Sequence, residues 1–193
     1  MMKAMTNMRP AVFLDRDGTL MVERSDPASL GDPQQVALET RVIPALQQLQ
    51  AAGYPLIVVT NQSGIGRGLY TVSDYERVTQ RLADLLADHH ITLTATYHCP
   101  HHPTHAHPPY RQVCQCRKPN PGLIEQGMAA HGISPDGSWM IGDRLTDMMA
   151  GQAVGIPGIL LLTGNGSHDA PHWHRVAPTL WDAVTQWVLP RRV

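Results

Sequence analysis

The chain has 193 residues, which is enough for one compact domain with its own hydrophobic core. Its formal net charge of −1 provides no basic field that would hold nucleic acid or an anionic membrane. No apolar run is long enough to cross a bilayer, and residues 1–8 lack the apolar core of a signal peptide. We therefore expect a cytoplasmic monomer, folded over residues 9–190 after a flexible segment 1–8, without nucleic-acid or membrane partners.

Short apolar segments rich in β-branched residues alternate along the chain with segments of helical periodicity. The pattern predicts strands at 11–14, 55–60, 93–98, 138–141 and 158–162. It predicts helices at 42–52, from 73 onwards, at 121–131, at 145–154 and at 179–188, and a long loop over 20–39. This alternation is typical of a parallel sheet covered by helices on both faces, so we predict a Rossmann-like α/β fold.

Three helix starts are predicted from residues that cap helices. Ser73 and Glu76 match a capping box. Asn120 is placed to cap a helix that has Pro121 in its first turn, and Thr179 with Asp182 opens the last helix.

Two carboxylates stand directly after the first strand, in Asp15-Arg16-Asp17-Gly18-Thr19. Ligands of such folds bind outside the carboxyl ends of the strands, so both side chains are expected in that crevice. A phosphate ester adds negative charge there, which requires a divalent cation beside one carboxylate and a proton on the other. Mg²⁺ suits oxygen ligands of this kind. Asp15 would be the nucleophile and Asp17 the acid/base.

Polar groups that suit a phosphate follow later strands. Thr60 offers a hydroxyl at the end of the second strand, and Asn61, Gln62 and Ser63 are predicted to contact the substrate. Lys118 follows the loop after the third strand, where a cation would offset charge that develops in the transition state.

A third carboxylate follows the fourth strand. Asp143 is predicted to complete a magnesium site with Asp15 and Asp17. Asp147 is predicted to be an outer carboxylate or one at a helix N-terminus.

The three cysteines of the chain all lie in one His-rich stretch, residues 99–116. An odd count argues against a disulfide framework and favours a metal site. Cys99, His101, Cys114 and Cys116 provide the ligands of a closed, structural zinc site. The sequence leaves open whether one of three nearby histidines replaces His101 as the fourth ligand: His102, His105 or His107.

The order of these segments resembles that of the haloacid dehalogenase-like superfamily over nearly the whole chain. The residues that match its four successive motifs are Asp15 and Asp17, then Thr60, then Lys118, then Asp143 with Asp147. The resemblance implies a magnesium-dependent phosphatase, because dehalogenases lack the second aspartate of the first motif. P-type ATPases share that motif, but the chain has neither their membrane span nor a large cap domain between its motifs.

Within the superfamily, four stretches resemble the D-glycero-D-manno-heptose 1,7-bisphosphate 7-phosphatase family: residues 13–19, 59–68, 99–103 and 114–122. The resemblance implies a capless or minimally capped enzyme of cell-envelope precursor synthesis, acting on a small phosphorylated sugar. It also implies zinc on the Cys/His set and a substrate contact from Arg117. Arg67 is predicted as a second contact to phosphate or sugar.

Alternative functions remain at this stage. Histidinol-phosphate phosphatases have a similar zinc loop but lack the Gly-Ile-Gly-Arg-Gly run found at 64–68 and the Pro-Gly at 121–122. Polynucleotide 3′-phosphatases share the motifs, but a neutral chain without a basic stripe argues against DNA. A catalytically idle zinc-binding module is the third alternative, and the intact aspartates and lysine argue against it. Residues 23–39 do not match the family, so their role is open.

Overall fold

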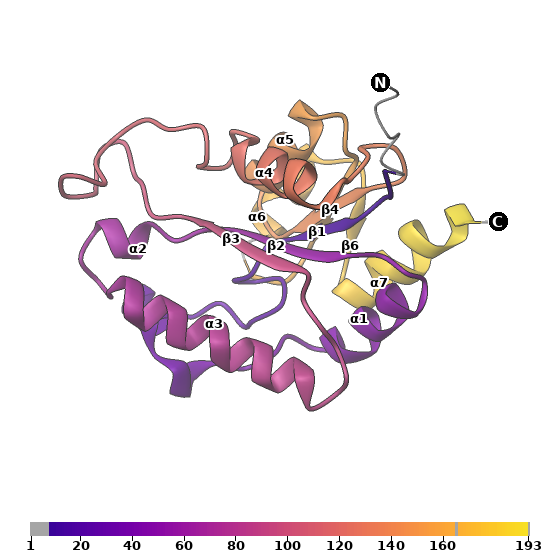
Figure 1. The fold of residues 1–193 in the computed structure, drawn as a ribbon, viewed down its shortest axis with the longest axis horizontal. Coiled ribbons are helices and arrows are strands. Elements are labelled where there is room, and N and C mark those ends of the chain that lie inside the picture. Colours follow the sequence, from indigo (N-terminus) through magenta and orange to yellow (C-terminus); the bar gives the residue numbers. More distant parts are fainter. Residues whose placement is uncertain (1–7, 165, 193) are drawn as a thin grey trace, which may run out of the picture.

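The computed structural model describes residues 8–164 and 166–192, so the segment 1–8 predicted to be flexible lies, apart from Met8, outside the described part. Six parallel strands form one sheet in the order β3-β2-β1-β4-β5-β6 (Figure 1). The strands are β1 (Val12–Leu14), β2 (Leu56–Asn61), β3 (Ala95–Cys99), β4 (Trp139–Gly142), β5 (Gly158–Leu161) and β6 (Val176–Ala177).

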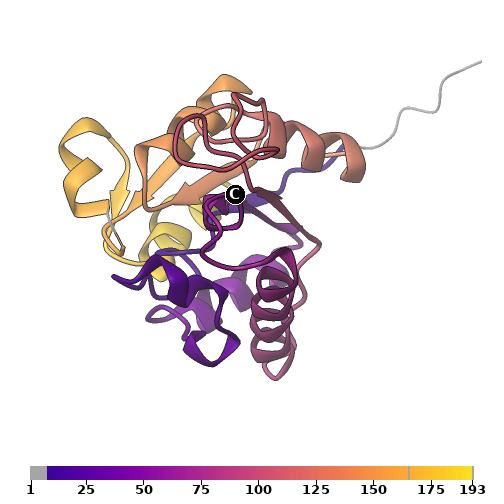
Figure 2. The ribbon, with the colours of Figure 1, turned by 90° about the vertical axis from the view of Figure 1, so that its left-hand side faces the viewer.

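Helices cover both faces of the sheet, with α4 and α5 on one side and α1, α3 and α7 on the other (Figures 1 and 2). The α-helices are α1 (Val42–Ala51), α2 (Ser63–Gly66), α3 (Val72–Ala87), α4 (Gly122–His131), α5 (Leu145–Ala153), α6 (Gly166–Asp169) and α7 (Leu180–Ala183). The short helices are η1 (Pro27–Gly31), η2 (Pro33–Gln35), η3 (Ala170–His172), η4 (Val184–Val188) and η5 (Leu189–Arg192). The predicted Rossmann-like sandwich is confirmed. No helix of the described chain is long and apolar enough to span a membrane.

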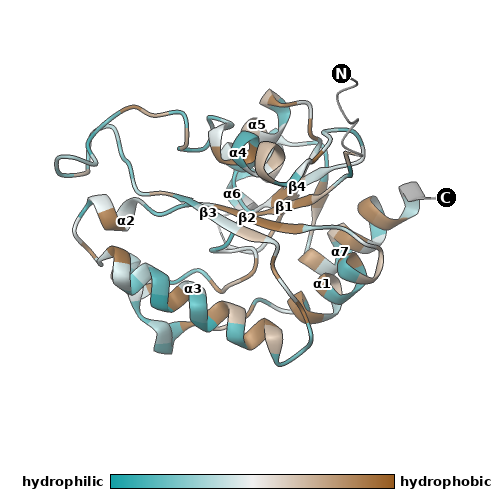
Figure 3. Ribbon diagram, in the orientation of Figure 1, coloured by the Kyte–Doolittle hydropathy of each residue, from teal (hydrophilic) through white to brown (hydrophobic). Residues whose placement is uncertain are grey.

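Alternate residues of the central strands supply two separate cores. Val12 and Leu14 pack with α1 and α3 residues on one face, while Phe13 packs with α4 residues on the other. Successive side chains of a strand point to opposite faces, so a strand buried on both sides reads as continuously apolar. The strands are accordingly hydrophobic along their centre, whereas the loop after β3 is largely hydrophilic (Figure 3).

Strand order reverses between β1 and β4, because β1 is followed in the sequence by β2 on one side while β4 and β5 continue on the other. The backbone N–H of Asp15 donates to Ile141 O at 2.9 Å, which extends the pairing of these two strands to their carboxyl ends. A reversal of this kind opens a crevice there. The residues that follow β1 and β4 are therefore placed side by side.

Two predicted helix caps are wrong. Helix α3 begins at Val72, and its capping box joins Thr71 to Asp74, not Ser73 to Glu76. Helix α4 begins at Gly122, with Pro121 at the N-cap position and no side-chain cap, and the Asn120 amide donates to Cys114 O at 2.8 Å.

Other element boundaries differ by a few residues, and the final helix shortens to α7 before continuing as η4. The predicted loop 20–39 contains η1 and η2, both opened by an Asp-Pro pair, Asp26-Pro27 and Asp32-Pro33. Between β1 and α1 the structure has these short helices and isolated β-bridges that join Asp17 to Met21 and Met21 to Leu38, which agrees with a minimal cap.

Candidate active site and metal centres

Three buried carboxylates meet at the carboxyl ends of β1 and β4. Asp15, Asp143 and Asp147 each offer an oxygen, and these oxygens all lie within 4.8 Å of one another. Asp147 is held from the first turn of α5, where its Oδ2 accepts the Arg144 N–H at 3.0 Å. The predicted position of Asp147 at a helix N-terminus is confirmed, but its other oxygen also faces the group.

Two glycines make room for the Asp143 carboxylate. A Cβ on Gly18 would lie 2.5 Å from Asp143 Oδ2, and one on Gly164 would lie 2.3 Å from it. Both glycines also have positive φ, at 78° and 53°. Any larger residue at either position would displace the carboxylate or strain the backbone.

Lys118 is the cation of this group. Its Nζ lies 2.6 Å from Asp15 Oδ1, 2.6 Å from Asp147 Oδ1 and 2.7 Å from Val59 O. Burial acts to lower the pKa of Lys118, but Asp147 and Asp15 outweigh it, so the net pKa is raised and the ammonium stays charged. The same lysine opposes the effect of burial on Asp15, whose pKa is raised to about 7 by desolvation and by the neighbouring Asp147 and Asp17.

Asn61 fixes the main chain that carries this lysine. Its amide donates to Lys118 O at 3.0 Å and accepts from Lys118 N at 3.1 Å. The end of β2 and the segment after the Cys/His loop are thereby joined across 57 residues. Asn61 was predicted to contact the substrate, but both polar atoms of its side chain are engaged in this pair.

Three carboxylates and one ammonium leave an excess of negative charge in a buried site. A hard divalent cation with a preference for oxygen ligands fits this donor set. Asp17 was predicted to complete the set, but its side chain is directed elsewhere: both oxygens accept from Arg16, and Oδ2 also accepts from Gln62. Asp147 takes its place in the group.

A pocket of about 400 Å³ opens over these residues. The buried part of its lining includes Asp15, Thr60 and Lys118, and the predicted site residues Asp17, Asn61, Ser63, Arg67 and Arg117 line it as well. Gln62 does not line it: the residue is 1% exposed and its amide bonds only to protein groups. Its prediction as a substrate contact is therefore not supported by its position.

Four arginines line the pocket, and two of them were not predicted. Arg24 and Arg144 join Arg67 and Arg117 around the opening. Arg144 also pairs with Glu23 at 2.6 Å, which links the loop before α1 to the segment after β4. Arg144 is the second residue after β4, and this position at the strand's carboxyl end could have indicated a role in the site. Nothing in the sequence distinguishes Arg24.

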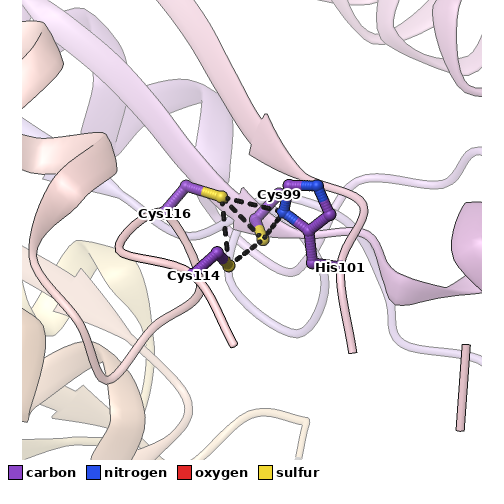
Figure 4. A group of neighbouring side chains, drawn as sticks. All are labelled: Cys99, His101, Cys114 and Cys116. Atoms are coloured by element: carbon purple, nitrogen blue, oxygen red, sulfur yellow. Dashed lines mark hydrogen bonds between the residues drawn. The ribbon is translucent and has the colours of Figure 1, made fainter. Parts of the chain in front are cut away.

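The Cys/His loop forms the second metal-binding group (Figure 4). The Sγ and Nδ1 atoms of Cys99, His101, Cys114 and Cys116 lie within 4.8 Å of one another. The sulfur atoms are 3.0 to 3.6 Å apart, and His101 Nδ1 is 3.3 Å from Cys116 Sγ. Tetrahedral zinc with bonds of about 2.3 Å to sulfur requires sulfur separations of roughly 3.8 Å, so a small expansion would accommodate it. The donor set fits zinc.

The three competing histidines are outside this group. His102 Nδ1 accepts the backbone N–H groups of Thr104 and His105 at 3.2 and 3.1 Å, and its ring lines the active-site pocket. His105 packs against the His102 ring, with centroids 4.8 Å apart. Among the described residues, His101 is the histidine that the metal-binding group contains.

Hydrogen bonds connect the Cys/His group to the active site. Arg117 Nη1 donates to His101 O at 3.1 Å, and Gly122 N donates to Gln115 O at 2.9 Å. Because Arg117 and Lys118 directly follow Cys116, the conformation of this group contributes, with Asn61, to where both cations lie.

Comparison with known proteins agrees with this geometry. A family model described as HAD-hydrolase-like matches residues 115–183. The structure of a D,D-heptose 1,7-bisphosphate phosphatase from B. bronchiseptica, complexed with magnesium and phosphate, superposes with a TM-score of 0.83 at 26% identity, covering 95% of this chain and 99% of that one. The fold and site therefore define a HAD-like hydrolase.

Sequence relatives define the family more narrowly. A D-glycero-beta-D-manno-heptose-1,7-bisphosphate 7-phosphatase from Pasteurella multocida is 41% identical over 80% of this chain and 82% of its own length. The protein of that name from Escherichia coli K12 is 38% identical over 95% of this chain and 93% of its own. The chain belongs to the heptose bisphosphate phosphatase family.

Proposed function

We propose that the protein removes the 7-phosphate of D-glycero-D-manno-heptose 1,7-bisphosphate, as the names of its relatives state for them. The observation that carries the proposal is the buried group of Asp15, Asp143, Asp147 and Lys118 at the base of an arginine-lined pocket. Residues 9–190 would act as one monomeric catalytic unit in the cytoplasm, in the synthesis of cell-envelope precursors.

The reaction has two steps. An Asp15 carboxylate oxygen attacks phosphorus and the bond from phosphorus to the C7 oxygen breaks, while Asp17 gives a proton to the departing oxygen. Water then attacks phosphorus of the aspartyl-phosphate, Asp17 takes the proton, and inorganic phosphate leaves with Asp15 restored. Lys118 and the Thr60 hydroxyl stabilise the charge on the transferring group.

A magnesium ion held by Asp15, Asp143 and Asp147 would neutralise carboxylate charge and orient the phosphoryl oxygens. This charge matters because burial raises the pKa of Asp15 to about 7. A neighbouring cation favours the ionised form, which is the form that attacks.

The second phosphate of the substrate would meet the arginines of the pocket. Arg67 and Arg117, predicted as substrate contacts, stand there with Arg24 and Arg144. Arginine presents several donors in a planar fork that matches phosphate. A bisphosphate places one phosphate on Asp15 and leaves the other for these side chains, whereas a monophosphate uses only one of the two sites.

Zinc on Cys99, His101, Cys114 and Cys116 would be structural, because four protein ligands leave no open position. Its role would be to order the polar loop and fix Arg117 and Lys118.

Asp15→Asn tests the nucleophile. Phosphate release that depends on magnesium should fall at least about 1,000-fold, since the amide oxygen is a poor nucleophile. Asp136→Asn, far from the pocket and exposed, is the control. Unchanged release by Asp15→Asn would refute the mechanism.

Substrate choice is tested by comparing both heptose bisphosphate anomers, fructose bisphosphate and histidinol phosphate. The expected preference is for a heptose bisphosphate. A higher kcat/KM for histidinol phosphate would replace the proposed substrate with the alternative one.

A further inference from the structure

A buried polar network lies beside the pocket around Asp17. Arg16 is fully buried, Gln62 is 1% exposed and Tyr70 is 8% exposed. All three belong to short segments that follow β1 or β2, yet Arg16, Gln62 and Tyr70 serve none of the steps described above. Buried polar side chains of this kind are costly unless every bond is made, so their arrangement calls for an explanation.

The amide of Gln62 has all four of its hydrogen-bonding positions in use. Its Oε1 accepts from Arg16 Nη2 at 3.0 Å and from Tyr70 OH at 2.7 Å. Its Nε2 donates to Asp17 Oδ2 at 2.7 Å and to Thr60 Oγ1 at 2.9 Å. Because Tyr70 and Arg16 both donate to the oxygen, the nitrogen has to face Asp17.

Tyr70 is held firmly in its donor role. A Cβ on Gly31 would lie 2.3 Å from the Tyr70 side chain, and one on Gly64 would lie 2.2 Å from its ring. Burial raises the pKa of Tyr70 to about 12, so its hydroxyl keeps its proton. The two glycines allow the ring to sit between η1 and α2, and the hydroxyl then reaches Gln62.

Arg16 holds the other side of the same carboxylate. Its Nε and Nη2 lie 3.1 Å from Asp17 Oδ1 and Oδ2, in a two-point contact. Its guanidinium also lies 5.5 Å from the centroid of the Tyr75 ring. Asp17 is thereby fixed by three donated hydrogen bonds, while it still lines the pocket.

We propose that Tyr70, Gln62 and Arg16 are positioning residues that set the direction of the Asp17 carboxylate for proton transfer to the leaving oxygen. The inference rests on the proposed role of Asp17 as acid/base. Tyr70 also lines the pocket, but its hydroxyl donates to Gln62 at 2.7 Å, so it acts on Asp17 through Gln62. A carboxylate that already points toward the leaving oxygen does not have to reorient before the proton moves. Its fixed orientation therefore lowers the barrier to proton transfer.

Tyr70→Phe tests this most cleanly, since it removes one hydroxyl and keeps the ring between the two glycines. Release of the sugar from heptose bisphosphate in a single turnover should slow by about fivefold, the factor that corresponds to one neutral hydrogen bond. KM should change less than about twofold. In the same single-turnover measurement, release of nitrophenolate from 4-nitrophenyl phosphate should be unaffected, because that group leaves without a proton and before the water step.

Gln62→Met is the second variant, similar in length and unable to donate. The rate of sugar release should fall by roughly 10- to 100-fold, because the hydrogen bond from Gln62 to the Asp17 carboxylate is lost. The rate of nitrophenolate release should again be unchanged. Tyr97→Phe is the control: its hydroxyl bonds to His131 at 3.1 Å on another part of the fold, so both substrates should react at the wild-type rate.

Equal slowing of both substrates, a change in KM alone, or no change in Tyr70→Phe would overturn the inference. Asp17→Asn separates this result from the proposed function. If Asp17→Asn slows the release of sugar but not the release of nitrophenolate in a single turnover, Asp17 is the acid. The results for Tyr70→Phe and Gln62→Met then test only the positioning role. If Asp17→Asn slows both equally, the assignment of Asp17 as acid is wrong.

Discussion

Removal of the Lys118 charge by Lys118→Met should destabilise the protein strongly. The lysine is 3% exposed and sits 2.6 Å from carboxylate oxygens of both Asp15 and Asp147. Taking away one partner of a buried ion pair leaves uncompensated charge and costs about 3–5 kcal/mol. For a chain of this length, the melting temperature should fall by roughly 6 to 20 °C.

The measurement is thermal unfolding in magnesium-free buffer without chelator, so that metal on the Cys/His group is not removed. Adding Asp147→Asn to Lys118→Met should recover part of the loss, because it removes one of the repelling carboxylates. Arg77→Met is the control, since its pair with Asp74 is on the surface and contributes little. A melting temperature for Lys118→Met within about 2 °C of wild type would refute the electrostatic account of the site.

Two further predictions concern a helix cap and the second metal group. Thr71→Ala removes the cap of α3 and should lower the melting temperature by about 2–4 °C, whereas Ser73→Ala should have little effect. A larger fall in melting temperature for Ser73→Ala than for Thr71→Ala would contradict the observed cap. Elemental analysis should find about one zinc per chain. The Cys116→Ser variant should lose the metal and show a lower melting temperature and a lower kcat. A wild-type protein that contains no zinc and keeps its full stability would refute a structural site.

The parts of the site predicted from the sequence are those that topology determines. In a parallel sheet, residues after neighbouring strands share one edge, so Asp15, Thr60 and Asp143 could be assigned to one crevice from the order of the strands. The Cys/His ligands were equally predictable, because few arrangements other than a metal site bring three cysteines and a histidine into one loop.

What escaped prediction depends on side-chain direction. Asp17 and Asp147 both follow strands, and only the structure shows that Asp147 joins the carboxylate group while Asp17 turns to Arg16 and Gln62. Strand β6 was missed because two residues carry no periodicity. The cap at Thr71 was missed because Ser73 with Glu76 offers the same spacing as Thr71 with Asp74.

The position of Lys118 is determined from two directions at once. On one side, Asn61 at the end of β2 bonds both to its carbonyl and to its N–H, so the sheet holds the lysine backbone. On the other, Cys116 is two residues earlier and belongs to the metal group, whose loop is closed onto the start of α4 by Gly122 and Asn120. Because the lysine ammonium must reach two carboxylates within 2.6 Å, a small shift of either support would separate the charges. The Cys/His loop therefore belongs to the catalytic apparatus through the backbone that it holds, although none of its metal ligands needs to touch the substrate.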